Sequence, residues 1–389
     1  MSQPEGYSDG TDCLCHLIKS LYGLKQAGRE WNAELNKELE AHNWNPSVVD
    51  PCLYIRKTSK GIEIIAIWVD DLLLFASSLA LMERMKRDLQ SLFEITDLGE
   101  PSKIVGIEIH RDYKHKTITI SQRQYIKSIL AKEGLLDCNS VGMPMNPNEK
   151  LIPSEGETGE DGYAHSYASL IGSLMYLAVA TRPDIAYAVY HLGSFMANPS
   201  MAHWSAAKRV LRYLSGTRDY GITYRADKPS PEENHFLGYS DASYANNDDV
   251  TSVSGYVFLM SGGAITWDSR KQNNVSLSTT ESEYVALAEA TRELTWLRNL
   301  LQGLGFDQLK PTVLYGDNSG ALAIAKDPQY HKRTKHFDTR HHYIHQKLQS
   351  QEVEIFYCPT SIMTADIFTK ALPKPKHQLH VAELGMSPN

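Results

Sequence analysis

Residues 236–244 place a carboxylate near the end of an alternating apolar strand, and this feature limits the folds open to the chain. Side chains two residues apart point to the same face of a strand, so Asp241 shares a face with Leu237 and Tyr239. A charge on such a face must be paired, hydrogen-bonded or bound to a metal, because burying it bare is costly. The sequence therefore predicts a sheet that gathers partners for Asp241.

Three later segments each offer an acidic partner. Glu283 lies in STTESEYVALAEA, Asp317 in VLYGDNSGAL and Asp366 in TADIFTK. Four carboxylates brought together by one sheet would form a hard-oxygen site for two divalent ions, which suits attack of water on a phosphodiester. Taken singly, each acid could instead be a surface charge or a helix cap. For Glu283 this alternative is concrete, because it stands three residues after Thr280, as in a capping box.

A second group of acids lies earlier in the chain. Residues 61–75 predict an apolar hairpin with Asp70 and Asp71 at its turn. In most proteins two adjacent acids there would be a plain surface turn. Here the flanking residues are so apolar that a metal-binding turn becomes a real alternative.

Size and composition limit the class of protein. With 389 residues, 42% of them hydrophobic, the chain can bury a core and hold more than one domain. A net charge of −7 gives no overall sign of nucleic-acid binding, so any such surface must be a local patch. Five cysteines form no paired framework, which suits a reducing intracellular compartment. The most apolar run, residues 170–180, is too short to cross a bilayer, and we expect no membrane partner.

Two basic segments could supply the local patch. The first is a helix expected at residues 203–215, whose cations form either a solvated side or a phosphate-contacting surface. The second is the stretch 331–345, where crowded histidines without thiols argue against zinc and favour contact with a nucleic-acid backbone. The candidate residues are Lys208, Arg209, Arg212, Lys332, Arg333, Lys335 and Arg340.

Several motifs between about residues 234 and 372 carry a family resemblance. YSDASYA, LSTTESEYVAL, GDNSGAL, KHFDTRHHYI and ADIFTK closely resemble the ribonuclease H domain of copia-type (Ty1-like) LTR retrotransposon Pol polyproteins. The resemblance implies a ribonuclease that cleaves the RNA strand of RNA–DNA hybrids with Mg²⁺, or Mn²⁺, as cofactor. It also implies that the metal ligands are Asp241, Glu283, Asp317 and Asp366.

The N-terminal third resembles the reverse transcriptase of the same family, through SLYGLKQAGREW and WVDDLLLFASS. The resemblance implies that Asp70 is the main metal ligand and Asp71 its neighbour. It places Tyr22, Gly23 and Gln26 around the incoming nucleotide. The family's first palm motif, with its own acid, lies upstream of a segment like MSQPEGY. We therefore expect this chain not to polymerise by itself.

The resemblance also predicts the organisation of the chain. The expected fold class is α/β (α+β): a partial reverse-transcriptase palm and helical thumb, followed by a ribonuclease H-like mixed sheet flanked by helices. The expected parts are a partial palm (1–100), a primer-grip hairpin, thumb and tether (101–228), a ribonuclease H-like domain (234–375) and a tail (376–389).

The expected partners are an RNA–DNA hybrid and template–primer nucleic acid, with a homodimer or full-length Pol supplying missing parts. The expected location is intracellular, in cytoplasmic virus-like particles or in the nucleus. The alternative is a catalytically inactive or domesticated relic that only binds nucleic acid.

Overall fold

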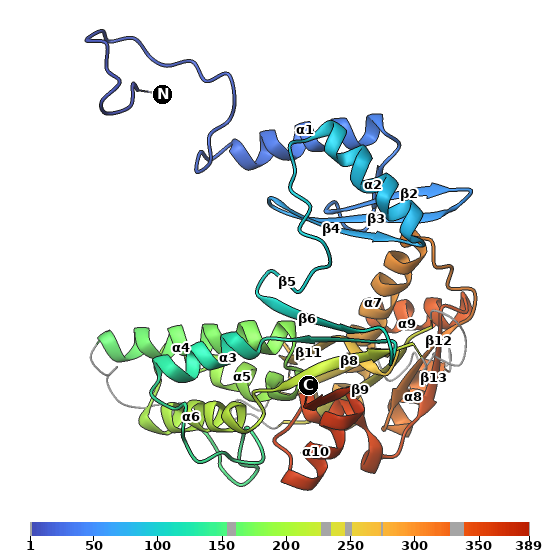
Figure 1. Cartoon of the computed structure of the whole chain (residues 1–389). Coiled ribbons are helices and arrows are strands. Elements are labelled where there is room, and N and C mark those ends of the chain that lie inside the picture. Colours follow the sequence, from blue (N-terminus) through green and yellow to red (C-terminus); the bar gives the residue numbers. More distant parts are fainter. Residues whose placement is uncertain are drawn as a thin grey trace. The chain divides into compact units, whose positions relative to one another are not determined.

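The computed structural model describes residues 2–153, 161–226, 235–245, 251–273, 275–326 and 338–388, with the backbone alone at 161–165 and 338–342 (Figure 1). The chain divides into two compact units. Unit 1 comprises Met1–Gly99 and Leu300–Gly305, and unit 2 comprises Glu100–Asn299 and Phe306–Asn389.

Unit 1 contains an antiparallel sheet of four strands in the order β1-β2-β3-β4. Two amphipathic helices cover it with apolar stripes, and Leu35, Leu39, Met85 and Leu89 are fully buried. The elements are α1 (Ala27–Ala41), β1 (Asn45–Pro46), β2 (Leu53–Thr58), β3 (Gly61–Trp68), β4 (Asp71–Ala76) and α2 (Leu79–Leu92).

The first sheet of unit 2 is antiparallel and has the order β14-β8-β7-β6-β5. The last strand of the chain therefore adds to a sheet that begins near residue 103. The strands are β5 (Lys103–Ile104), β6 (Ile107–Asp112), β7 (Thr117–Ser121), β8 (Tyr220–Arg225) and β14 (Met386–Pro388).

Four helices of unit 2 pack on one another and contribute to a shared hydrophobic core. Of these, α5 also packs against β11 (Gly263–Lys271). The segment at residue 183 begins as a short 3₁₀ helix, η1 (Pro183–Ile185), and becomes α-helical only at Ala186. The helices are α3 (Arg123–Lys132), α4 (Asp161–Ala180), α5 (Ala186–Gly193) and α6 (Met201–Gly216).

The second sheet of unit 2 is mixed and has the order β11-β10-β9-β12-β13. Strands β9, β10 and β11 run antiparallel, whereas β12 is parallel to both β9 and β13. The remaining elements of this part are β9 (Leu237–Ser243), β10 (Val253–Met260), α7 (Thr279–Leu304), β12 (Thr312–Gly316), α8 (Ser319–Lys326), α9 (Asp338–Gln349), β13 (Val353–Tyr357), η4 (Thr360–Ile362), η5 (Thr364–Phe368) and α10 (Lys374–Glu383). This mixed sheet with flanking helices confirms the predicted fold class.

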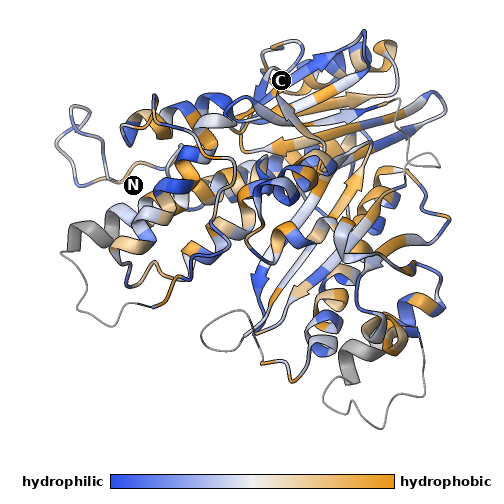
Figure 2. Cartoon of the chain, turned by 90° about the horizontal axis from the view of Figure 1, so that it is seen from below, coloured by the Kyte–Doolittle hydropathy of each residue, from blue (hydrophilic) through white to orange (hydrophobic). Residues whose placement is uncertain are grey.

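Apolar residues, orange in Figure 2, follow the strands and the adjoining helices. Val253 and Val257 of β10 pack with Ile367 and Phe368 of η5 in the same core. The segment that carries Asp366 is thereby fixed against the sheet that carries Asp241. None of the helices in the described ranges combines the length and the apolar character that a membrane span requires.

Candidate metal centre and nucleic-acid surfaces

Asp241 lies on β9, the central strand of the mixed sheet, and is only 1% exposed. Its cross-strand neighbour on β10 is Gly255. A Cβ on Gly255 would stand 2.7 Å from the Cβ of Phe368 and 2.8 Å from the Cγ2 of Thr369. Glycine at this position therefore lets the end of η5 approach the sheet beside the acid.

Glu283 comes from the first turns of α7, and the alternative interpretation of Glu283 as the partner of a Thr280 cap is wrong. The cap is Ser278, whose hydroxyl accepts a hydrogen bond from the Glu281 amide at 3.2 Å. Glu281 in turn accepts one from the Leu277 amide at 2.6 Å, so a different acid completes the capping arrangement. The Glu283 carboxylate therefore takes no part in the helix cap, and it lies beside Asp241 and Asp317.

Asp317 directly follows β12, the parallel neighbour of β9. Its Oδ2 accepts a hydrogen bond from the Thr360 hydroxyl at 2.7 Å. Asp241, Glu283 and Asp317 each offer one carboxylate oxygen, and these three oxygens lie within 4.8 Å of one another. Such a set of hard oxygen ligands fits Mg²⁺ or Mn²⁺.

Asp366 lies in η5, and its carboxylate is linked to Asp241 through a lysine. The Lys370 ammonium stands 2.5 Å from Asp366 Oδ1 and 3.6 Å from Asp241 Oδ2. Lys376 forms a second ion pair with Asp366, and the Thr369 hydroxyl donates to Asp241 Oδ2. The structure therefore brings three of the four predicted ligands into one group, with the fourth, Asp366, beside them and paired with two lysines.

Burial tends to raise the pKa of the acids in this cluster whose pKa is shifted. It raises the pKa of Asp241 to about 7, with the charges of Asp366 and Asp317 adding to the effect and Lys370 opposing it. It also raises the pKa of Glu283 to about 10, again with help from Asp241 and Asp317. At Asp366 burial has the same tendency, but Lys370 and Lys376 outweigh it and lower the pKa. A divalent cation among these acids would favour their ionised forms.

Asp70 and Asp71 are both exposed, at the turn between β3 and β4. Val69 in this turn has a φ of 55°, and its carbonyl accepts a hydrogen bond from Trp31 Nε1 at 3.2 Å. Within the described residues, no third acid, histidine or cysteine joins Asp70 and Asp71 in a metal-binding group. Their role as metal ligands stays a prediction.

The residues predicted around the nucleotide lie just before α1. The side chain of Tyr22 is 93% exposed, and Gly23 has a φ of 91°, which glycine adopts readily. Gln26 is the N-cap residue of α1, although its side chain makes no capping hydrogen bond. Their role also stays a prediction.

The basic residues of α6 differ in what they contact. Lys208 is exposed, with its ammonium 5.6 Å from the centre of the Trp204 ring. Arg209 is half-buried, and Arg212 donates from Nε to the Asn139 carbonyl at 2.8 Å. The other candidates, Lys332, Arg333 and Lys335, lie outside the described residues, as does the side chain of Arg340.

Four residues that contact the acids were not predicted from the sequence: Thr360, Thr369, Lys370 and Lys376. A local signal existed for one of them, because Lys370 stands four residues after Asp366, a spacing that brings side chains together on a helical turn. The other contacts depend on tertiary packing.

The mixed sheet with β9 at its centre and helices at its flanks has the ribonuclease H-like fold class that the motifs predicted. The comparisons with known proteins identify the family. Residues 1–147 match the family model described as reverse transcriptase (RNA-dependent DNA polymerase). Over 397 aligned residues the chain is 36% identical to the "Retrovirus-related Pol polyprotein from transposon TNT 1-94" of Nicotiana tabacum, covering 100% of this chain and 29% of the relative.

A shorter relative matches over most of its own length. The chain is 33% identical to the "Putative transposon Ty5-1 protein YCL074W" of Saccharomyces cerevisiae, covering 76% of this chain and 94% of that protein. Among solved structures, LC11-RNase H1, isolated from compost, is 16% identical with a TM-score of 0.29, over 35% of this chain and 93% of that one. The chain belongs to the Pol polyproteins of copia-type retrotransposons, and it spans 29% of the tobacco relative.

Proposed function

We propose that this Pol segment is a ribonuclease H that cleaves the RNA strand of RNA–DNA hybrids by metal-assisted hydrolysis of the phosphodiester. One observation carries the proposal: Asp241, Glu283 and Asp317 converge to within 4.8 Å from three separate elements of a mixed sheet and its helices. Burial raises the pKa values of Asp241 and Glu283, and acids crowded in this way are costly to maintain without a cation, which supports a functional origin.

In the proposed mechanism Asp241, Glu283 and Asp317 would hold divalent metal, with Asp366 completing the site. A pair of such ions would supply activation of the attacking water and stabilisation of the leaving 3′ oxygen. The protein fixes its own ligands: Thr369 donates to Asp241, and Thr360 donates to Asp317. Ser278 caps α7, so the Glu283 carboxylate does not serve as a hydrogen-bond acceptor for the end of the helix.

For the N-terminal part we propose a segment of an RNA-directed DNA polymerase that binds template–primer. The match of residues 1–147 to the reverse-transcriptase family supports the ancestry. Asp70 and Asp71 would act only with further ligands, supplied by a second copy or by full-length Pol. We propose that the chain consists of a partial palm (1–100), a primer-grip hairpin, thumb and tether (101–228), a nuclease domain (234–375) and a tail (376–389). We also propose that it acts inside the cell.

The test is digestion of a labelled RNA–DNA hybrid with Mg²⁺, beside the same RNA as a free strand. Cleavage confined to the hybrid supports the nuclease. Binding of the hybrid without cleavage would instead support the catalytically inactive, nucleic-acid-binding relic. The matched control is Asp241→Asn, which removes one ligand charge while keeping the side-chain shape.

A further inference from the structure

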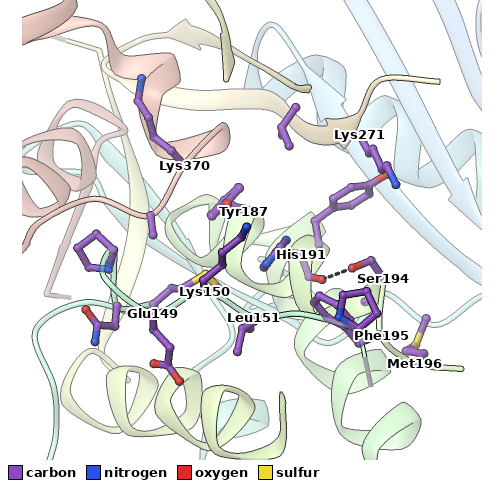
Figure 3. A pocket seen from close by; sticks show the side chains of 18 of the residues that line it. Glu149, Lys150, Leu151, Tyr187, His191, Ser194, Phe195, Met196, Lys271 and Lys370 are labelled. Carbon is purple, nitrogen blue, oxygen red and sulfur yellow. Dashed lines mark hydrogen bonds between the residues drawn. The ribbon is translucent and has the colours of Figure 1, made fainter. Parts of the chain in front are cut away.

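Lys370 lies between two of the acids and beside a cavity. The cavity, of about 820 Å³, is lined mainly by residues 145–153, by α5 and by residues 194–198 that follow it, and Lys370 also lines it (Figure 3). In Figure 3 the Lys370 ammonium points away from the other labelled side chains of the cavity. It points instead toward the acids, at 2.5 Å from Asp366 Oδ1 and 3.6 Å from Asp241 Oδ2.

This position is that of a cation shared by two carboxylates. The Asp241 and Asp366 side chains are 2% and 0% exposed, so their charges are poorly compensated by solvent. Lys370 supplies the missing positive charge through a flexible four-carbon stem, and its own side chain remains 34% exposed. A compact ammonium of this kind can leave the acids without any change in the backbone.

Lys376 provides a contrast within the same site. Its ammonium contacts Asp366 and the Thr360 carbonyl, the latter at 3.0 Å. Lys376 therefore pairs with the other carboxylate oxygen of Asp366, Oδ2, and also forms a hydrogen bond to η4. Of these two lysines, Lys370 alone contacts both Asp366 and Asp241.

We propose that the Lys370 ammonium takes the place of one divalent ion in the metal-free protein, between Asp241 and Asp366, so that loading of this position is an exchange of lysine for metal. The first ion would enter at Asp241, Glu283 and Asp317, where three carboxylate oxygens already converge. The second ion binds more weakly because it must displace Lys370. The inference rests on the proposed function only in taking the acid cluster as a metal site.

The experiment is a calorimetric titration of the full chain with Mn²⁺, with Mg²⁺ as a second probe, on the natural protein and on three variants. Lys370→Met removes the competing ammonium, and the weaker of the two binding steps should tighten about tenfold or more, the size expected when a hydrogen bond between charged groups no longer competes. Lys370→Arg keeps a cation in place and should retain the weak second step.

Lys376→Met is the matched control, because it removes the same charge from the same Asp366 but frees no position beside Asp241. If the two methionine variants tighten the second step equally, the effect is general electrostatics and the proposal is wrong. The proposal is equally overturned if Lys370→Met leaves the titration unchanged, or if the natural protein binds no metal in either probe.

A second measurement guards against misfolding. Thermal unfolding in chelator should show Lys370→Met less stable than the natural protein, because two buried acids lose their cation, and Mn²⁺ should raise its Tm by more. An equal or smaller rise in Tm counts against the proposal. Digestion of the hybrid is measured separately. If Lys370→Met tightens the second metal-binding step but the protein does not cleave hybrids, only the nuclease function is wrong. If the protein cleaves hybrids and Lys370→Met leaves the second step unchanged, only this inference is wrong.

Discussion

The acids of the mixed sheet and the acids of the β3–β4 turn occupy opposite environments. Asp241 is buried, and it is held by the Thr369 hydroxyl and by Lys370. Asp70 and Asp71 are exposed next to each other on one turn. Acids from separate elements can converge on one point, whereas two neighbouring residues of a single exposed turn bring no further ligand with them. The first region therefore forms a ligand group from its own side chains, and the second does not within the described residues.

The largest expected effect is the difference in hybrid cleavage when one acid is removed from each region. Asp241→Asn should lower hybrid cleavage by about a thousandfold or more, since a metal ligand contributes several kcal/mol to the transition state. Asp70→Asn should leave cleavage unchanged. Initial rates on a labelled hybrid measure both, with circular dichroism confirming the fold. Retained activity in Asp241→Asn would refute the assigned role of that acid.

The second prediction contrasts the two activities in one buffer. With Mg²⁺ present the isolated chain should cleave the hybrid and add no nucleotide to a template–primer, because Asp70 and Asp71 are exposed and no third ligand joins them among the residues that the structure describes. A primer-extension gel run beside the cleavage assay provides the comparison. Clear extension by the isolated chain would show that the turn acids need no further partner.

The third prediction concerns stability without metal. The pKa of Glu283 is raised to about 10, so between its ordinary value and about 10 the folded protein holds a proton that the unfolded chain has lost. In chelator this acid should therefore make the free energy of unfolding fall as pH rises through that window. Glu283→Gln removes the dependence, and its Tm advantage over the natural protein should grow from pH 6 to pH 9.

The control for that measurement is Asp70→Asn, where the side chain is exposed. Substitutions at such sites change stability by about 0.5 kcal/mol or less, so its difference from the natural protein should be small at both pH values. A flat pH response of Glu283→Gln relative to the natural protein would contradict the buried, charge-crowded environment of Glu283.

The smallest expected effect concerns the basic residues of α6, which lie outside both acidic regions. Lys208→Ala should weaken hybrid binding a few-fold and lower the dependence of log K on log salt by about one unit, as for a single phosphate contact. Arg212→Ala should also lower stability, because Arg212 Nε already donates to the Asn139 carbonyl. Filter binding at several salt concentrations, with a Tm for each variant, separates the two roles. No change in the salt dependence for Lys208→Ala would leave that side chain as part of a solvated face.

Much of the fold could be predicted from local pattern. The alternation of residues 237–243 gave the strand of Asp241, and the motifs around the four acids gave the ribonuclease H-like class, since both depend on neighbours in sequence. The capping role offered to Thr280 was wrong for a local reason. Ser278 and Glu281 stand at the same spacing two residues earlier, and spacing alone could not choose between the two pairs.

The sequence by itself determined which residues carry charge, which elements they lie on, and the family to which the chain belongs. Only the tertiary structure decided how those charges are compensated: that three acids share one small volume, and that Lys370 stands between the fourth acid and Asp241. The reason is distance along the chain. Thr369 and Asp241 are 128 residues apart, and contacts of that separation depend on how whole elements pack, for which local pattern carries no information.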